Sequence, residues 1–282
     1  MKRSGKAVGY AAIYIMLIML AVFTIFPVVY ILLSSFKSNQ EILVGGVNLL
    51  PKEWLLDNYK QAWTLANFGR LTFNSIFYAF FVVVGCVISS LAAGYVFARG
   101  KTKITRIINT MVLCSLFISI GTLSLYPQLH LAKAVGLSGS LWGPIIIHVF
   151  GMNATQVFIA TGFIRQISSE IDEAARIDGC GFFKIFYKII FPLCKPLIAT
   201  SGLMAFRKAW SDYLLPYVFT ISEKDKWPLV VGVVSLKSSG EAVSSWNLML
   251  AGISISILPM LIVYLFLNRY FIAGLTEGAV KG

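Results

Sequence analysis

Three ionisable residues stand at the end of a long uncharged stretch, and they are the strongest candidates for chemistry in the sequence. Pro196–Phe206 carries no charge, and Arg207, Lys208 and Asp212 follow it. At membrane depth each ionisable group costs roughly 2.5–3.5 kcal/mol on insertion scales and usually faces a cavity or a partner. Lys208 and Asp212 are four residues apart, so on a helix they would share a face and could pair.

Two interpretations of this cluster remain open. The cluster could lie near a membrane interface, where long basic side chains reach the headgroups. Alternatively, this face lines a pathway for a polar solute, with Trp210 and Tyr213 offering flat surfaces to a sugar or peptide. Asn153 and Gln156, on the preceding apolar segment, could hydrogen-bond the same solute, although contacts between helices explain these amides equally well.

Residues typical of metal or nucleotide chemistry are few and scattered. No C-x-x-C pair occurs among the four cysteines, and His130 and His148 are far apart in the sequence, so we expect no disulfide framework and no metal site and interpret both histidines as helix or loop filler. The sequence lacks G-x-x-x-x-G-K-[ST], which cradles nucleotide phosphates. We therefore expect no cofactor and no enzymatic activity, and any ATP hydrolysis must come from partner chains.

The composition is that of a membrane protein. Of 282 residues, 57% are hydrophobic and 13% are charged, whereas soluble globular chains have about 45–50% and about 25%. The formal net charge of +12 would suggest nucleic-acid binding in a soluble chain, but in a membrane protein it reflects basic cytoplasmic loops. We therefore predict that the protein contacts the lipid membrane and has no nucleic-acid partner.

Six apolar segments predict an all-α, polytopic protein with six transmembrane helices, each about long enough to cross ~30 Å of hydrocarbon. These segments are Tyr10–Leu33, Thr72–Ala98, Ile107–Leu125, Trp142–Ile164, Leu197–Ile221 and Leu248–Asn268. With the N-terminus inside, the inner segments hold 14 Lys and Arg in 62 positions and the outer segments hold 8 in 80. This bias predicts that both termini are cytoplasmic.

The predicted domain organisation follows from these spans. Residues 1–71 form the first transmembrane helix and an outer loop, residues 72–270 form a five-helix transmembrane domain, and residues 271–282 form a cytoplasmic tail. In the second span, Gly85, Ser89 and Ala93, and also Ser90 and Gly94, recur four residues apart. Such spacing of small residues predicts close approach of a neighbouring helix backbone.

A cytoplasmic loop at residues 165–195 is patterned like two short helices with a glycine hinge. Ser169 and Asp172 resemble a capping box, and Gly179 suits the left-handed position just past a helix end. Phe182 and Phe183 then begin an apolar stripe and could anchor in a cleft of another protein. Without further information, an interfacial helix lying on lipid headgroups would explain the same stripe.

The residues of this loop resemble the EAA motif of permease subunits of binding-protein-dependent ATP-binding cassette importers. The resemblance rests on Glu173-Ala174-Ala175, Asp178-Gly179 and, after a hydrophobic interval, Ile190-Phe191-Pro192-Leu193, with Phe191-Pro192 where Leu-Pro is usual. It implies that residues 168–190 are coupling helices that sit in a groove of an ATPase subunit. The residues implied in coupling are Glu173, Ala174, Ala175, Asp178, Gly179, Phe182, Phe183 and Pro192.

Further segments resemble the carbohydrate-uptake group of these permeases, which includes the smaller membrane subunit of the maltose transporter. They include Asn58-Tyr59, Gly94–Arg99, Trp210-Ser211-Asp212 with Ser where the group has Asn, and the ending Gly274–Gly282. The resemblance implies the type I importer permease fold and a place in the cell membrane. It also implies these partners: a homologous second permease, two ATP-binding cassette ATPase subunits, an extracytoplasmic solute-binding protein and an oligosaccharide substrate.

Three questions stay open at this point. A secondary, ion-coupled transporter is the alternative function, although no convincing internal repeat supports it. Arg207 and Lys208 make an acidic oligosaccharide conceivable, while a neutral one is the default. The outer loop Glu223–Asn247, with Lys237–Glu241, is either a contact for the binding protein or a solvated connection.

Overall fold

The computed structural model describes residues 2–46, 48–118, 121–151, 153–238 and 245–279. Side chains of residues 2–9, 11 and 267–279 lie outside the description. The described residues contain helices, turns and irregular segments but no strand, which confirms the predicted all-α class. The chain divides into two compact units, residues 1–68 with 232–258, and residues 69–231 with 259–282.

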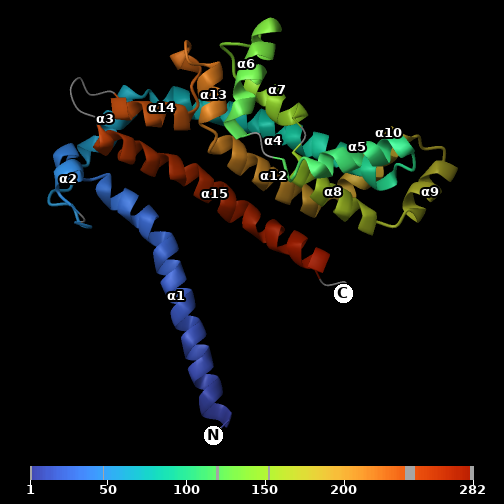
Figure 1. Cartoon of the computed structure of the whole chain (residues 1–282), viewed down its shortest axis with the longest axis horizontal. Coiled ribbons are helices and arrows are strands. Elements are labelled where there is room, and N and C mark those ends of the chain that lie inside the picture. Colours follow the sequence, from blue (N-terminus) through green and yellow to red (C-terminus); the bar gives the residue numbers. More distant parts are fainter. Residues whose placement is uncertain (1, 47, 119–120, 152, 239–244, 280–282) are drawn as a thin grey trace. The chain divides into compact units, whose positions relative to one another are not determined.

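The helices vary widely in length (Figure 1). The α-helices are α1 (Lys2–Ser34), α2 (Asn39–Val44), α3 (Asp57–Leu65), α4 (Phe68–Arg99), α5 (Lys103–Cys114), α6 (Leu125–Ala134), α7 (Trp142–Phe150), α8 (Ala154–Gln166), α9 (Glu170–Ile177), α10 (Phe182–Ile185), α11 (Phe191–Leu193), α12 (Lys195–Trp210), α13 (Leu214–Phe219), α14 (Leu229–Ser235) and α15 (Trp246–Ala279). Three 3₁₀ turns, η1 (Gly121–Ser124), η3 (Lys224–Lys226) and η4 (Leu236–Ser238), and one π-helix, η2 (Phe186–Ile190), complete the described elements.

Three of the described helices are long and apolar enough to cross a membrane, namely Ala12–Ser34, Phe68–Arg99 and Trp246–Phe266. Two bent helix pairs raise this number to five if each pair forms one span. α7 and α8 make an angle of 44°, and Phe182–Leu193 makes an angle of 83° with α12. The described helices therefore supply three to five spans.

Three of the six predicted spans are not continuous helices. The predicted span Trp142–Ile164 is divided between α7, which ends at Phe150, and α8, which begins at Ala154. α5 is a 12-residue helix that ends at Cys114, so the stretch predicted at Ile107–Leu125 is not one continuous helix. In the predicted span Leu197–Ile221, α12 stops at Trp210 and α13 starts at Leu214. Apolar composition is the same in a continuous and in a broken span, so it could not reveal these breaks.

In the first unit, the buried side chain of Asn58 joins three segments. Its Nδ2 donates hydrogen bonds to the carbonyl oxygens of Ser35 and Lys37, both at 2.9 Å. Its Oδ1 accepts a 2.8 Å hydrogen bond from Nδ2 of Asn247 at the start of α15. Because buried polar groups need partners, this amide satisfies two carbonyl oxygens just after α1. Its bond to Asn247 fixes α3 beside the start of α15.

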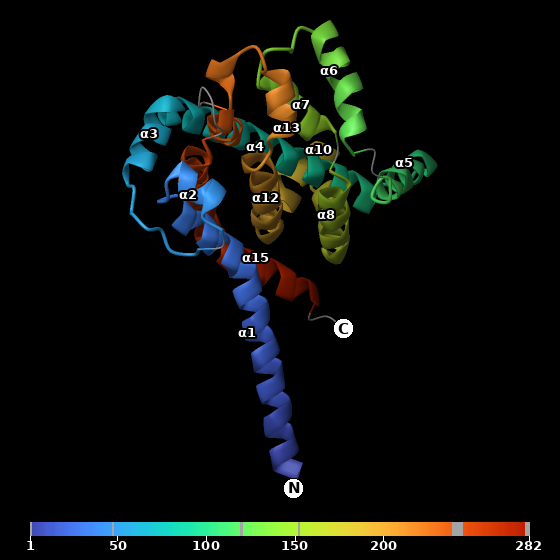
Figure 2. The same ribbon diagram turned by 60° about the vertical axis from the view of Figure 1, so that its left-hand side comes forward.

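In the second unit, α4 packs closely against α7 and α8. A Cβ atom on Gly94 would lie 2.7 Å from Cβ of Ala160 and 3.0 Å from main-chain atoms of α8. A Cβ atom on Gly85 would lie 2.2 Å from a methyl carbon of Val149 in α7. The close approach predicted from the small residues is thus confirmed at these two positions. α8 and α12 run side by side in the same unit (Figure 2).

The segment predicted as an outer loop at 223–247 is partly helical. It contains η3, α14 and η4, and Leu229, Val231, Val233 and Leu236 are buried. A solvated connection therefore does not describe residues 229–236. Ser239, Gly240 and Glu241, part of the predicted contact for a binding protein, lie outside the described residues.

Candidate functional site

The loop at 165–195, called the coupling loop from here on, folds as predicted into two short helices with a glycine between them. α9 ends at Ile177, and Gly179 has φ +77°, which an L side chain rarely adopts. α10 then leads into the π-helix η2 and α11. The hinge position of Gly179 is confirmed, whereas the π-helix had no signal in the apolar periodicity.

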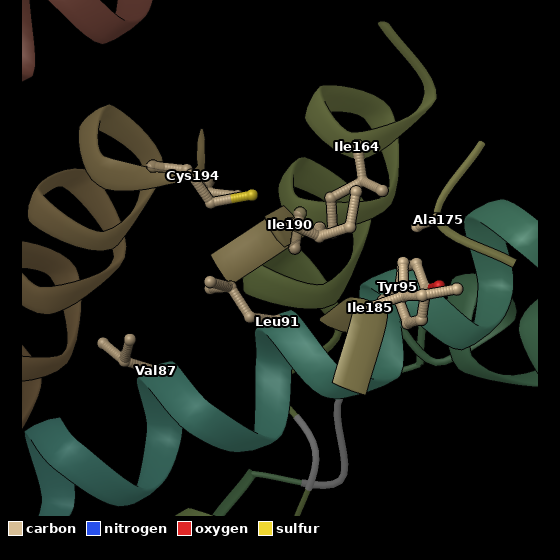
Figure 3. Close-up of a cluster of buried hydrophobic side chains, with 10 residues drawn as sticks. Val87, Leu91, Tyr95, Ile164, Ala175, Ile185, Ile190 and Cys194 are labelled. Atoms are coloured by element: carbon tan, nitrogen blue, oxygen red, sulfur yellow. The ribbon is translucent and has the colours of Figure 1, made fainter. Parts of the chain in front are cut away.

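One buried hydrophobic cluster fixes the coupling loop to the long helices of the second unit (Figure 3). Ala175, Ile185, Ile190 and Cys194 come from the loop and its exit. Val87, Leu91 and Tyr95 come from α4, Ala160 and Ile164 come from α8, and Leu197 comes from α12. Because close-packed side chains transmit displacement rather than absorb it, the loop is built as a rigid attachment and not as a free connection.

The predicted capping box does not form, and Asp172 has a different role. Ser169 has a helical backbone and makes no side-chain cap. Asp172 is only 3% exposed and turns into the protein, where Oδ2 accepts a 2.8 Å hydrogen bond from Nε of Arg99 and Oδ1 accepts one of 2.9 Å from Oη of Tyr95. Nη2 of Arg99 also donates to the carbonyl oxygen of Ile167 at 2.8 Å. The end of α4 thereby neutralises a buried carboxylate that the sequence suggested was part of a capping box.

The ring of Tyr95 also contacts the second half of the loop. Its centroid lies 4.7 Å from that of Phe182 and 5.4 Å from that of Phe186. Part of the Phe182 ring therefore packs against Tyr95 within the chain, whereas the Phe183 side chain is 83% exposed. Of the two aromatic residues predicted as anchors, Phe183 has the freer side chain.

Most of the predicted coupling residues lie on the surface. Exposed among them are Glu173, Ala174, Asp178, Gly179, Phe182, Phe183 and Pro192, whereas Ala175 is buried. Ile177 is also exposed, at 87%. The loop therefore presents small and aromatic side chains outward while Ala175 and Asp172 hold it from within.

A second candidate site is a cavity of about 470 Å³ in the same unit, called the polar cavity from here on. It is lined by Gly121, Thr122, Ser124, Leu125, Gln128, Ile147, His148, Gly151, Asn153, Lys208, Asp212, Leu214 and Leu215. Its volume is in the range of small-molecule sites. Hydroxyl, amide and charged groups lie beside leucine and isoleucine walls, which suits a ligand with both hydrogen-bonding and C–H surfaces.

Asp212 is held in this cavity by two side chains. Its Oδ2 accepts a 2.8 Å hydrogen bond from Oη of Tyr78 and lies 2.8 Å from Nε2 of His148. The predicted pair of Lys208 with Asp212 is wrong, because α12 ends at Trp210 and Asp212 lies beyond the helical register. Both residues instead line the cavity, and Asp212 binds to α4 and α7.

The other predicted pathway residues divide into two groups. Asn153 lines the polar cavity and accepts the main-chain hydrogen bond of Gln156 at the start of α8. Gln156 is buried and donates to the carbonyl oxygen of Ser201 at 3.0 Å. Trp210 is 6% exposed, and its ring stacks on Phe206 at 5.4 Å, so its ring is not free to stack on a sugar in this arrangement.

Arg207 is exposed, and the half-buried ring of Tyr213 stacks on Tyr217 at 5.4 Å. Neither residue lines the polar cavity. Two side chains that bind Asp212 were not predicted as site residues: Tyr78 carried no signal, and the interpretation of His148 as helix or loop filler is wrong. A lone histidine or tyrosine in an apolar helix carries no signal of its partner, since α4, α7 and the end of α12 are far apart in the sequence.

Comparisons with known proteins agree with this arrangement. Residues 90–277 match the family described as "Binding-protein-dependent transport system inner membrane component". The chain is 30% identical over 274 residues to the diacetylchitobiose uptake system permease protein NgcG of Streptomyces coelicolor, covering 96% of this chain and 89% of that protein. It is 31% identical to the melibiose/raffinose/stachyose import permease protein MelC of Bacillus subtilis, with 91% of each chain covered.

A solved structure of a transporter has a similar fold. The fold is similar, with a TM-score of 0.78 and 26% identity, to a chain in the crystal structure of a bacterial ABC transporter involved in the import of the acidic polysaccharide alginate. The match covers 95% of this chain and 98% of that one. With matches over nearly its full length, this chain belongs to the family of inner-membrane components of binding-protein-dependent transport systems.

Proposed function

We propose that this protein is one permease subunit of an ATP-binding cassette importer for oligosaccharides, forming half of the translocation pathway. The relatives whose names specify sugar uptake match nearly the whole chain, and the coupling loop offers an exposed surface on a buried support. Six membrane spans with both termini in the cytoplasm complete the proposed topology. In this proposal residues 107–125 and the broken segment 197–221 each cross the membrane.

The proposed partners are a homologous second permease, two ATPase subunits and an extracytoplasmic solute-binding protein. The ATPase subunit receives the coupling loop, with Ala174 and Gly179 allowing close approach and Phe183 acting as an anchor. The exposure of these three residues supports this assignment, because contacts at protein interfaces concentrate on aromatic side chains that enter a pocket. Glu173 and Asp178 border the same surface.

The polar cavity is proposed as the part of the solute pathway that this subunit contributes. Asp212 accepts hydrogen bonds from sugar hydroxyls, Lys208 and Asn153 donate hydrogen bonds to them, and the leucine walls contact the C–H face of the ring. A carboxylate and an ammonium group in one cavity suit a neutral sugar better than a uronic acid, because Asp212 would repel the substrate's own charge. Gln156 and Trp210 support this region from within the helix bundle, and Arg207 and Tyr213 are the chain neighbours of Lys208 and Asp212.

Uptake by proteoliposomes tests the proposal. The complete complex, loaded with its binding protein, is assayed with radiolabelled raffinose, diacetylchitobiose, arabinotriose and a trimer of mannuronate. ATP-dependent uptake of a neutral sugar is expected, and it should stop when the phosphate-binding lysine of the ATPase is replaced. Uptake by this protein alone along an ion gradient, without ATP, would instead identify a secondary transporter.

A further inference from the structure

We infer that Tyr78 and Tyr95 are positioning residues that make α4 and residues 172–212 move as one rigid body. Residues 172–212, called the arm from here on, run from α9 of the coupling loop to the polar cavity. The inference rests on the proposed function, because it concerns how motion of the coupling loop reaches the solute pathway. It assigns to α4, which contains none of the EAA residues, the role of a rigid support.

The arm needs a rigid supporting element because its helices are interrupted. Gly179 separates α9 from α10, and the chain bends by 83° between Phe182–Leu193 and α12. A π-helix lies just before this bend, and such segments are weak points in a helical ladder. A displacement of α9 would therefore be absorbed at these breaks if nothing held the arm straight.

α4 is the continuous element beside these breaks. It runs without interruption for 32 residues, from Phe68 to Arg99. At 1.5 Å per residue, Tyr78 and Tyr95 are about 25 Å apart along it. Each of these two tyrosines donates a hydrogen bond to an aspartate at one end of the arm, Tyr95 to Asp172 at 2.9 Å and Tyr78 to Asp212 at 2.8 Å.

Both tyrosines are buried, and both attachments are reinforced by a second partner. Tyr78 is 0% exposed and Tyr95 is 1% exposed. Arg99 adds an ion pair to Asp172, and His148 of α7 adds a second partner to Asp212. Hydrogen bonds to a charged acceptor are stronger than ordinary ones and fix geometry, so each end of the arm is bound to a definite point of α4.

Apolar packing fills the interval between the two attachments. Leu91 and Val87 share the buried cluster with Ile190 and Leu197 of the arm. Further along, a Cβ on Gly202 would lie 3.8 Å from Val83 and 3.9 Å from Val87, which is ordinary van der Waals distance. Packing at these points lets the arm tilt with α4, and a chain of packed elements of this kind can carry coupling between distant sites.

In this arrangement α9 receives the motion of the partner and α4 transmits it. Motion imposed on the exposed face of α9 is delivered to Asp212, and hence to the polar cavity, through α4. Removing one tyrosine hydroxyl leaves the ring packing intact and leaves each aspartate its second partner. Such a variant should fold and hydrolyse ATP within its complex, while less of each ATPase cycle is converted into transport.

The test uses the complete reconstituted complex and the sugar that the wild-type complex imports in the uptake assay above. Tyr78→Phe and Tyr95→Phe are compared with Tyr126→Phe, whose ring is 77% exposed on α6. The ATP hydrolysed per sugar imported should rise three- to tenfold in the first two variants and stay unchanged in the third. Mere loss of folded complex would lower hydrolysis and uptake together and would not change this ratio.

A second measurement needs no sugar. Hydrogen exchange of residues 170–178 and 212–220 is compared in the complex before and after trapping with ATP and vanadate. In the wild type both segments should change, whereas in Tyr95→Phe the change at 212–220 should be largely lost and the change at 170–178 should remain. The inference would be overturned if both tyrosine variants kept the wild-type ratio of ATP hydrolysed to sugar imported and the wild-type changes in hydrogen exchange. Sugar uptake by the wild-type complex that does not depend on ATP would instead overturn the proposed function.

Discussion

Arg99 and Asp172 form a buried ion pair with a distance of 2.8 Å between Nε and Oδ2, joining the last residue of α4 to the first helix of the coupling loop. The two side chains are 11% and 4% exposed. Their 73 residues of separation in the sequence make this pair a purely tertiary contact. It determines that α9 is fixed to a membrane helix at the point where the ATPase is proposed to bind.

Replacing only one member of this pair should destabilise the protein strongly. Arg99→Gln leaves a buried carboxylate with Tyr95 as its remaining partner, and removal of one member of a buried pair typically costs about 3–5 kcal/mol. The fraction of complex that stays assembled after heating in detergent measures the effect. Arg106→Gln, a change in an exposed residue of α5 with no acidic partner at salt-bridge distance among the described residues, is the matched control.

The double variant Arg99→Gln with Asp172→Asn should be more stable than either single variant, because it removes both charges at once. If the stability loss of the double variant equals the sum of the losses of the two single variants, the two residues act independently. This result would contradict the ion pair as the source of the effect.

Gly179→Ala should weaken coupling more than Gly181→Ala. Gly179 has φ +77°, where an L residue is strained by about 1–2 kcal/mol, whereas Gly181 has φ −74° and free space around its Cα. The strain would tilt α9 relative to α10. The ratio of sugar imported to ATP hydrolysed checks this prediction, and equal ratios in the two variants would remove the hinge from the mechanism.

Glu173→Lys should also uncouple hydrolysis from transport while leaving the fold intact. Glu173 is exposed on α9, so a reversed charge there disturbs a partner surface and not the core. The measurement is import by the reconstituted complex at an expression level matched to the wild type. Import at the normal rate would mean that this face of α9 does not contact the ATPase.

Phe183→Ala and Phe182→Ala should have different effects. Phe183 is 83% exposed, so its truncation should release the ATPase subunit, with a loss of at least tenfold in affinity if it is an interface anchor. Phe182 packs on Tyr95, so its truncation should lower the stability of the permease itself. Co-purification of the ATPase and thermal stability of the permease separate the two effects, and a retained ATPase in Phe183→Ala would rule out the anchor.

Gly94→Ala should destabilise the second unit, although alanine normally favours helices. The added Cβ would lie 2.7 Å from Cβ of Ala160 and 3.0 Å from the main chain of α8, and overpacking of this kind typically costs about 1–3 kcal/mol. Gly162→Ala on α8 has no atom within 4 Å of its Cβ and serves as the control. Similar melting of the two variants would mean that α4 and α8 can separate easily.

The membrane character, the all-α class and the two-helix coupling loop could all be predicted from the sequence. Hydrophobicity depends on local composition, the EAA pattern is contiguous, and the left-handed backbone of Gly179 follows from its place just after a helix end. These features are local, so they need no knowledge of what packs against them.

The partners of the charged residues were decided by the tertiary structure. Asp172 was expected in a capping box and is buried against Arg99 and Tyr95. Asp212, which could pair with Lys208 on a continuous helix, instead binds Tyr78 and His148. A sequence states which residues share a helix face only while the helix continues, and α12 ends two residues before Asp212. The attachment of both aspartates to α4 arises from long-range packing, which brings together groups that no local pattern connects.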